Sequence, residues 1–211
     1  MTLRNDTAVA FEDVRQDKTS VAIKELAERA RGRDVTVGEI LAALKDRGFG
    51  VFMILFALPN AVIPGVSFIL GAPVVLFALQ LAAGRNEVWL PEFMRRQKLS
   101  AALFEKAAAR VEKFLVWIEK RSMPRWSSIV SGTAERLLGL YIAVVAGFLM
   151  MPIPFGNALP ALGIALMAVG LIEKDGKAAV IGMVLGLLGA LYIGVAVAAG
   201  LEAFEAALRI F

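Results

Sequence analysis

A charge-free stretch of 37 residues broken by three prolines is the feature that most limits how this chain can fold. Residues 48–84 contain no Asp, Glu, Lys or Arg, and their prolines are Pro59, Pro64 and Pro73. A proline inside a helix removes one backbone hydrogen bond and clashes with the preceding turn. The first arm, residues 49–58, would be about 15 Å long as a helix, whereas the hydrocarbon core of a bilayer is about 30 Å thick. The arm is therefore too short to cross a membrane alone.

A second charge-free block, residues 137–172, has the same pattern. Its break holds three prolines, a glycine and an asparagine: Pro152, Pro154, Gly156, Asn157 and Pro160. The arms on either side are somewhat short for a membrane span, which needs about 20 residues. Each of the two blocks follows an arginine, pairs a proline with an asparagine, and meets another proline before its second arm. We interpret this similarity as an internal repeat.

The third apolar block, residues 178–201, differs because its 24 residues include no proline. It is the one segment that the sequence predicts plainly as a transmembrane helix. Gly182, Gly186 and Gly189 give it a face of small residues on which another helix can pack closely. That helix belongs either to the same chain or to a second copy in a homodimer.

These blocks predict an all-α integral membrane protein with two related re-entrant, broken-helix hairpins. One clear C-terminal transmembrane helix and several amphipathic interfacial helices complete the predicted fold. Residues 1–18 are expected to be a mobile tail, and residues 19–211 a single membrane domain. Within that domain, repeat one spans about residues 36–121 and repeat two about residues 122–201.

The charges outside the blocks indicate which side of the membrane they face. Residues 1–50 hold nine Lys and Arg against nine Asp and Glu, and residues 85–136 hold eleven against six. Lys and Arg in short loops mark the cytoplasmic side, so both segments are expected there. The first block would then enter and leave on that side, with its tip at residues 59–65. The competing interpretation is that the return arm, residues 66–83, crosses the membrane, which would invert the repeats.

Three charged segments have the spacing of amphipathic helices that lie on a membrane surface or on the embedded core. These segments are residues 19–32, 36–47 and 99–121. In the second segment, Thr36 and Glu39 have the spacing of a capping box. Three tryptophans flank the third segment in the manner of interfacial anchors: Trp89, Trp117 and Trp126.

The absence of cysteine and histidine excludes several kinds of chemistry. Disulfides, thiolate nucleophiles, Cys/His zinc sites and Ser-His-Asp triads all need one of these residues. Glu173 and Asp175 are a weak candidate for a divalent-metal site, because a solvated loop explains two carboxylates there equally well. We therefore name no catalytic residue, and we expect no metal, no cofactor and no nucleic-acid partner.

The two breaks are the predicted functional centre. Broken helices expose backbone N–H and C=O groups, which survive at membrane depth only if they are buried in protein or line a wet cavity. Two facing breaks would form a polar pocket for an ion, a lipid headgroup or a polyprenyl-linked sugar. The candidate binding residues lie at the breaks, on one arm and at the block ends: Asn60, Asn157, Pro59, Pro64, Pro154, Pro160, Gln80, Arg47, Arg85 and Arg136.

Each of these residue types also has a purely structural interpretation. An asparagine at a break can cap its own arm, and the prolines can simply shape the fold. The arginines can bind phosphate through paired donors, or they can extend to the membrane surface. No charged residue lies inside the three blocks, so a proton relay through the bilayer is disfavoured.

Several ordered motifs resemble the ExoD family of bacterial exopolysaccharide synthesis proteins. They are RGFGVFMILFALPNAVIPG, Trp89-Leu90-Pro91, Pro124-Arg125, ERLLG and PIPFGNALPALGIALMAVGLIEKDG, within about residues 20–200. The resemblance implies a multi-pass protein of the bacterial inner membrane, required for normal exopolysaccharide production, and it supplies no catalytic mechanism. In that setting the chain is either transporter-like or lipid-handling, or it is a non-catalytic scaffold whose amphipathic helices bind biosynthetic proteins.

Overall fold

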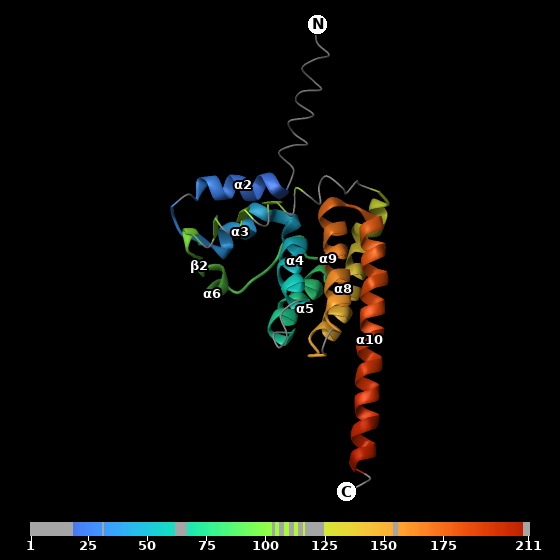
Figure 1. The fold of residues 1–211 in the computed structure, drawn as a ribbon. Coiled ribbons are helices and arrows are strands. Elements are labelled where there is room, and N and C mark those ends of the chain that lie inside the picture. Colours follow the sequence, from blue (N-terminus) through green and yellow to red (C-terminus); the bar gives the residue numbers. More distant parts are fainter. Residues whose placement is uncertain are drawn as a thin grey trace. The chain divides into compact units, whose positions relative to one another are not determined.

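The computed structural model describes residues 19–30, 32–61, 67–102, 125–153 and 156–208, together with seven positions between 104 and 116. The predicted tail, residues 1–18, lies outside this set. The described residues are helical apart from two short strands and connecting turns, which confirms the predicted all-α class (Figure 1). The chain forms two compact units. The charged unit comprises residues 1–48 and 87–123, and the apolar unit comprises residues 49–86 and 124–211. The boundaries of the two repeats stay predictions.

The described part of the charged unit consists of short elements: α2 (Thr19–Arg29), β1 (Val35–Thr36), α3 (Val37–Leu44), η1 (Lys45–Arg47), α6 (Glu92–Arg95) and β2 (Lys98–Leu99). The two strands pair antiparallel, with buried Val35 opposite Leu99. The helix predicted to begin at residue 99 therefore starts later, because Leu99 is held in the strand pair. Its first helical hydrogen bond joins the Phe104 N–H to the Ser100 carbonyl. Much of that helix lies outside the described residues.

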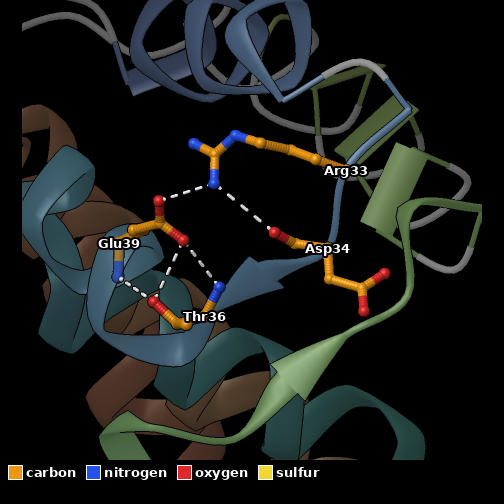
Figure 2. Close-up of polar contacts among 4 residues, drawn as sticks. All are labelled: Arg33, Asp34, Thr36 and Glu39. Atoms are coloured by element: carbon orange, nitrogen blue, oxygen red, sulfur yellow. Dashed lines mark hydrogen bonds and ion pairs between the residues drawn. The ribbon is translucent and has the colours of Figure 1, made fainter.

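The predicted capping box at the start of α3 is confirmed (Figure 2). The Glu39 N–H donates to Thr36 Oγ1 at 3.2 Å, and the Thr36 N–H donates to Glu39 Oε2 at 2.8 Å. Arg33 Nη1 lies 2.8 Å from the other carboxylate oxygen of Glu39. The hydrogen bond from the Thr36 backbone, and then that from Arg33, lower the Glu39 pKa to about 2. α3 ends at Leu44, three residues earlier than expected, because Lys45–Arg47 form a 3-10 turn.

Five helices dominate the described part of the apolar unit: α4 (Gly48–Asn60), α5 (Ser67–Ala82), α8 (Gly132–Leu149), α9 (Ala158–Glu173) and α10 (Gly176–Leu208). A 3-10 turn, η2 (Ser127–Val130), precedes α8. The first two apolar blocks are thus each two helices joined at a break. Pro59 lies in the last turn of α4, but Pro73 does not interrupt α5 as expected. An apolar helix packed against its neighbours tolerates the loss of one backbone hydrogen bond at a proline.

The helices α4, α5, α8 and α9 form a closed cycle of neighbours. The Phe52 ring of α4 contacts the Phe77 ring of α5, with centroids 5.5 Å apart. A Cβ on Gly139 of α8 would lie 2.7 Å from the backbone of α5, and one on Gly50 of α4 would lie 2.8 Å from the backbone of α9. α8 and α9 also pack against each other. Glycine at these positions lets the helix backbones approach directly.

Both breaks lie at the same end of this cycle. Gly139, early in α8, packs beside the end of α5, whereas Gly71, early in α5, packs beside Met150 just after α8, so these two helices run antiparallel. Lys174, which follows α9, bonds the carbonyl of Val130, which precedes α8. We call the end with the breaks at residues 60–67 and 150–157 the break end. The base end is the opposite one, and it holds residues 84–86, 125–136 and 173–177.

α10 packs along α9 through glycines. A Cβ on Gly163 of α9 would lie 2.5 Å from the Gly186 nitrogen, and Gly189 packs against Pro160. The small-residue face is therefore used within the chain, and the homodimer stays a prediction. α10 extends well past α8 and α9 (Figure 1), and no described residue beyond Ile193 is buried.

Among the described residues, two helices are long and apolar enough to cross a membrane: α8 and the Gly176–Glu202 part of α10. The sequence predicted only the second plainly. α8 also qualifies, with 18 residues, because it begins at Gly132, five residues before the apolar block. Both helices expose large apolar side chains: Leu137, Leu140 and Val144 of α8, and Ile181, Val184, Leu187, Leu188, Leu191 and Val195 of α10. An apolar surface of this kind is typical of a protein that faces lipid.

Candidate functional site at the helix breaks

Three polar side chains from different helices meet at the break end of the apolar unit. Asn60 is the last residue of α4, Ser67 is the first residue of α5, and Asn157 directly precedes α9. They are only 2%, 3% and 8% exposed, respectively. We call these three residues the Asn–Ser–Asn cluster. It joins the two asparagines that the sequence placed at separate breaks.

Hydrogen bonds connect the cluster across both breaks. Asn157 Nδ2 donates to Ser67 Oγ at 2.7 Å and to Asn60 Oδ1 at 3.2 Å. Asn60 Nδ2 donates to the Ser67 backbone carbonyl at 3.2 Å. The two helix–break–helix segments are therefore tied together by side chains that are 90 or more residues apart in the sequence.

The carbonyl of Ser67 fixes how both amides are oriented. A carbonyl oxygen can only accept, so the Asn60 amide must present Nδ2 to Ser67 and Oδ1 to Asn157. Asn157 must in turn present Nδ2 to Asn60, because two amide oxygens would repel each other. Its own Oδ1 is then left over. This oxygen is buried, and no described residue donates a hydrogen bond to it.

Asn157 does not use its side chain to cap its own helix. Its backbone is at the N-cap position of α9, where its carbonyl accepts from the Ala161 N–H at 3.1 Å. No hydrogen bond from its side chain reaches the first turn of α9. The structural interpretation in which each asparagine only caps its own arm is therefore wrong for Asn157. A buried acceptor without a donor costs about 1–3 kcal/mol, so its position calls for an explanation.

The predicted prolines divide into two groups. Pro59 precedes Asn60 in α4, and Pro160 lies buried in the first turn of α9, against Gly189 of α10. Both thus adjoin the cluster in the chain and shape the helix ends that hold it. Pro64 and Pro154 lie outside the described residues.

Gln80 and the arginines are not part of the cluster. Gln80 is buried on α5, but it is 13 residues after Ser67, about 20 Å away along the helix axis. Arg85 and Arg136 lie exposed at the base end. Arg47 belongs to the charged unit, where it ends η1.

Arg136 lies against the C-terminal end of α5. Gly84 has a left-handed φ of +77°, its N–H donates to the Leu81 carbonyl at 2.9 Å, and the Arg85 N–H donates to the Gln80 carbonyl at 3.1 Å. These two bonds form a Schellman motif, which satisfies carbonyls at a helix end. A Cβ on Gly84 would lie 2.6 Å from Arg136 Nε. The guanidinium therefore stands where the helix dipole favours a positive charge.

The remaining charges of the base end also have partners. Asp175 Oδ1 accepts from the N–H groups of Lys177 and Ala178 at 3.0 and 3.3 Å, which caps α10. Lys174 Nζ lies 3.7 Å from Glu135 Oε2, and Lys177 Nζ lies 5.4 Å from the centre of the Trp126 ring. Asp175, proposed from the sequence as half of a metal pair, thus serves as a helix cap. The described residues contain no group of three or more acidic side chains placed to hold a metal ion.

Sequence reasoning missed Ser67 as a member of the site. The signal was present, because Ser67 is the one hydroxyl residue of the first apolar block and follows Asn60 by seven positions. It also missed Tyr141, whose hydroxyl donates to the Met183 carbonyl at 2.7 Å and joins α8 to α10.

Comparison with known proteins identifies the family. The model of a family described as "Exopolysaccharide synthesis, ExoD" matches residues 19–195. An uncharacterised protein of the cyanobacterium Synechocystis is 33% identical over 173 residues, which is 78% of this chain and 80% of the relative. The protein named ExoD of Rhizobium meliloti is 30% identical over 180 residues, which is 80% of this chain and 72% of the relative. No solved structure matches the chain.

Proposed function

The chain belongs to the ExoD family of exopolysaccharide synthesis proteins, and from this premise we propose that it is a lipid-handling, transporter-like membrane protein. Its paired helix breaks form the polar site. The observation that carries the proposal is the buried Asn–Ser–Asn cluster, which ties the two breaks together and leaves one amide oxygen without a described donor. Polar groups at membrane depth are costly, and they mark functional sites more often than packing.

In this proposal the two helix–break–helix segments are re-entrant hairpins that enter the bacterial inner membrane from the cytoplasm. α4, α5 and α9 have 13, 16 and 16 residues, or about 20–24 Å of helix, which is short of the roughly 30 Å hydrocarbon core. The base end carries the exposed cations, in keeping with a cytoplasmic surface: Arg85, Arg125, Arg136, Lys174 and Lys177. The ends of α5 and α9 both lie beside the start of α8, which supports same-side hairpins over inverted ones.

The hairpins also support an internal repeat, but the residues that correspond between the two repeats differ from those that the sequence indicated. Asn60 ends a first arm, whereas Asn157 precedes a second arm. The positional counterpart of Asn157 is therefore Ser67, which begins the second arm of the first hairpin. In this view a polar residue at the start of each second arm is the shared feature.

Lipid handling fits the chemistry of the cluster better than ion pumping. The three apolar blocks contain no charged residue that could relay protons or balance a buried ion. The polar head of a lipid, or of a polyprenyl-linked sugar, would occupy the break end. Its hydrocarbon tail would stay on the apolar outer surface of α8 and α10.

A scrambling assay tests this function. The purified protein is reconstituted into liposomes with a fluorescent lipid, and dithionite bleaching reports transfer between leaflets. We expect transfer above protein-free liposomes, and a loss to background in the double variant Asn60→Ala, Asn157→Ala. The matched control is Asn86→Ala, an exposed asparagine at the base end, which should transfer lipid like the original chain. Equal transfer by protein and by empty liposomes for both a phospholipid and a polyprenyl-linked sugar would refute the function.

Cysteine labelling tests the orientation, because the chain has no cysteine of its own. Single cysteines at Asn86 and Lys174 should react with a membrane-impermeant maleimide only from the cytoplasmic side. A cysteine at Glu202, in the distal part of α10, should react only from the periplasmic side. Labelling of Asn86→Cys and Lys174→Cys from opposite sides would instead favour the competing topology, in which the repeats are inverted.

The alternative function is a non-catalytic scaffold that binds biosynthetic proteins through amphipathic helices. It rests mainly on residues 99–121, much of which lies outside the described residues. Cross-linking in native membranes distinguishes it. A stable complex with an exopolysaccharide synthase, together with no lipid transfer by the purified protein, would favour the scaffold.

A further inference from the structure

We propose that the Asn–Ser–Asn cluster binds a neutral hydroxyl group, of the kind that a sugar or another polyol carries, at Asn157 Oδ1, next to the start of α9. The inference rests on the proposed function, because it names the chemical class of ligand that the same site takes. Three features of the described residues carry it: the free acceptor, the helix end beside it and the lack of charge.

The first feature is the free acceptor. Asn157 is only 8% exposed, and both protons of its Nδ2 are already donated to Ser67 and Asn60. Its Oδ1 accepts from no described residue. A ligand that satisfies this oxygen must therefore bring a hydrogen-bond donor.

The second feature is the end of α9. The first N–H groups of a helix have no partner within the helix, and a polar N-cap side chain usually accepts from one of them. Asn157 is the N-cap residue, but its side chain makes no such bond. The free acceptor therefore belongs to the residue at the positive end of the α9 dipole, which disfavours a cation there.

A hydroxyl group matches this pair of features because it donates one hydrogen bond and accepts others. A cation would be drawn to Asn157 Oδ1 but disfavoured by the positive end of the α9 dipole. An anion would suit the helix end but be repelled by the amide oxygen. A neutral group that both donates and accepts hydrogen bonds is compatible with the amide oxygen and with the helix end.

The third feature is the lack of charge around the cluster. Residues 48–84 and 137–172 contain no Asp, Glu, Lys or Arg, so a charged ligand would be buried there without a counter-ion. Burial of an unpaired charge is far more costly than burial of a hydroxyl that makes its hydrogen bonds. The site thus selects against charged ligands as well as for hydroxyl groups.

The test compares two ligands of the same shape on the full chain in phosphatidylcholine nanodiscs. The first is n-octyl β-D-glucoside, and the second is its tetra-O-methyl derivative, which keeps the ring and the tail but has no hydroxyl donor. Isothermal titration below the micellar concentration should show binding of the glucoside, and binding about tenfold weaker or worse for the methylated form. This comparison needs no variant, so it stands even where a substitution prevents folding.

Asn157→Ala should weaken glucoside binding about tenfold, the effect of one lost hydrogen bond. The control is Tyr141→Phe, which removes a different interhelical hydrogen bond, far along the chain from the cluster, and should leave glucoside binding within about twofold. Equal binding of the two ligands, no binding of either, or binding unaffected by Asn157→Ala would each overturn the inference. So would Asn157-dependent stabilisation by sodium chloride but not by choline chloride, because it would identify a cation site.

The outcome separates this inference from the proposed function. Normal lipid scrambling with no hydroxyl-dependent binding would refute the ligand class alone. Hydroxyl-dependent binding with no scrambling of any lipid would refute the transfer function and leave the ligand class intact.

Discussion

The two ends of the apolar unit differ in how their helix termini are satisfied. At the base end, the end of α5 is capped by the Gly84 turn and the start of α10 by the Asp175 carboxylate, whereas α8 begins there without a side-chain cap. At the break end, α9 begins without a side-chain cap, and Asn157 leaves an acceptor unused. Capping is worth about 1 kcal/mol per helix end, so α9 lacks a stabilisation that α5 and α10 gain at the base end. The unused acceptor of Asn157 is the reason why we propose the site at the break end.

The two ends can differ in a lasting way only if the helices between them are packed rigidly. The close contact of α9 with α10 at Gly163 should provide this rigidity. Gly163→Leu should cost about 3 kcal/mol of unfolding free energy, because any Cβ there meets the backbone of Gly186. Guanidinium unfolding followed by tryptophan fluorescence measures the loss. The control is Gly147→Leu, at an exposed glycine of α8 with no atom within 4 Å of a new Cβ, and it should be neutral or slightly stabilising. Equal losses in the two variants would show that the crossing is loose.

Within the break end, the two asparagines should differ in their effect on stability. Asn60→Ala should cost about 2 kcal/mol of unfolding free energy, because it leaves the Ser67 carbonyl and one Asn157 amide proton buried without a hydrogen-bond partner. Asn157→Ala loses two hydrogen bonds but also removes the unused acceptor, so its net cost should stay within about 1 kcal/mol. The same unfolding experiment compares them. A larger loss for Asn157→Ala than for Asn60→Ala would mean that Oδ1 is satisfied, and that the two ends do not differ.

At the base end, Asp175→Ala should cost about 1 kcal/mol through loss of the α10 cap. Asp175→Asn keeps an accepting oxygen and should recover most of that stability. The thermal midpoints of both variants, measured in nanodiscs, test the cap. A loss of lipid transfer in Asp175→Asn, with its stability intact, would assign function to the base end and so weaken the contrast.

The smallest expected effect concerns the cap of α3 in the charged unit. There a carboxylate of the chain itself takes part in the cap, as Asp175 does for α10 at the base end. The folded-state pKa of Glu39, about 2, lies below its ordinary value of 4.5, so folding favours the ionised carboxylate. Its contribution is complete above about pH 4.5 and should fade as the pH falls toward 2. Glu39→Gln should remove this pH dependence, which amide exchange at the start of α3 would report. An unchanged exchange profile in that variant would show that other carboxylates dominate.

Much of this fold follows from local sequence rules. The spacing of Thr36 and Glu39 predicts their capping box, and prolines within three positions of Asn60 and Asn157 predict breaks in two apolar blocks. These features depend on residues a few positions apart, where backbone geometry leaves few choices. The failures arise where packing decides instead. Pro73 is held inside α5 by its neighbours, and Leu99 joins a strand with Val35, a residue 64 positions earlier in the chain.

The candidate site was predictable only in part, for the same reason. That Asn60 and Asn157 lie at breaks can be read from the sequence, and the structure adds that they bond each other. Which amide atom is left over cannot be read, because it depends on the carbonyl of Ser67 and on a chain of hydrogen bonds across two hairpins. Whether each donor and acceptor finds a partner depends on the whole cluster, so no local sequence pattern predicts it.

The length of α10 sets how deep the cluster lies in the proposed orientation. From Gly176 to Glu202 the helix rises about 40 Å, so with its capped start at one headgroup layer, Glu202 emerges in the other. The 16 residues of α9 rise only about 24 Å from the same layer. About 5 Å of this rise lies in the headgroup layer, so Asn157 lies within the opposite leaflet, with roughly 11 Å of hydrocarbon above it. A polar headgroup could reach it from the periplasmic face across this shorter barrier, while its route from the cytoplasm would be the full length of the hairpins.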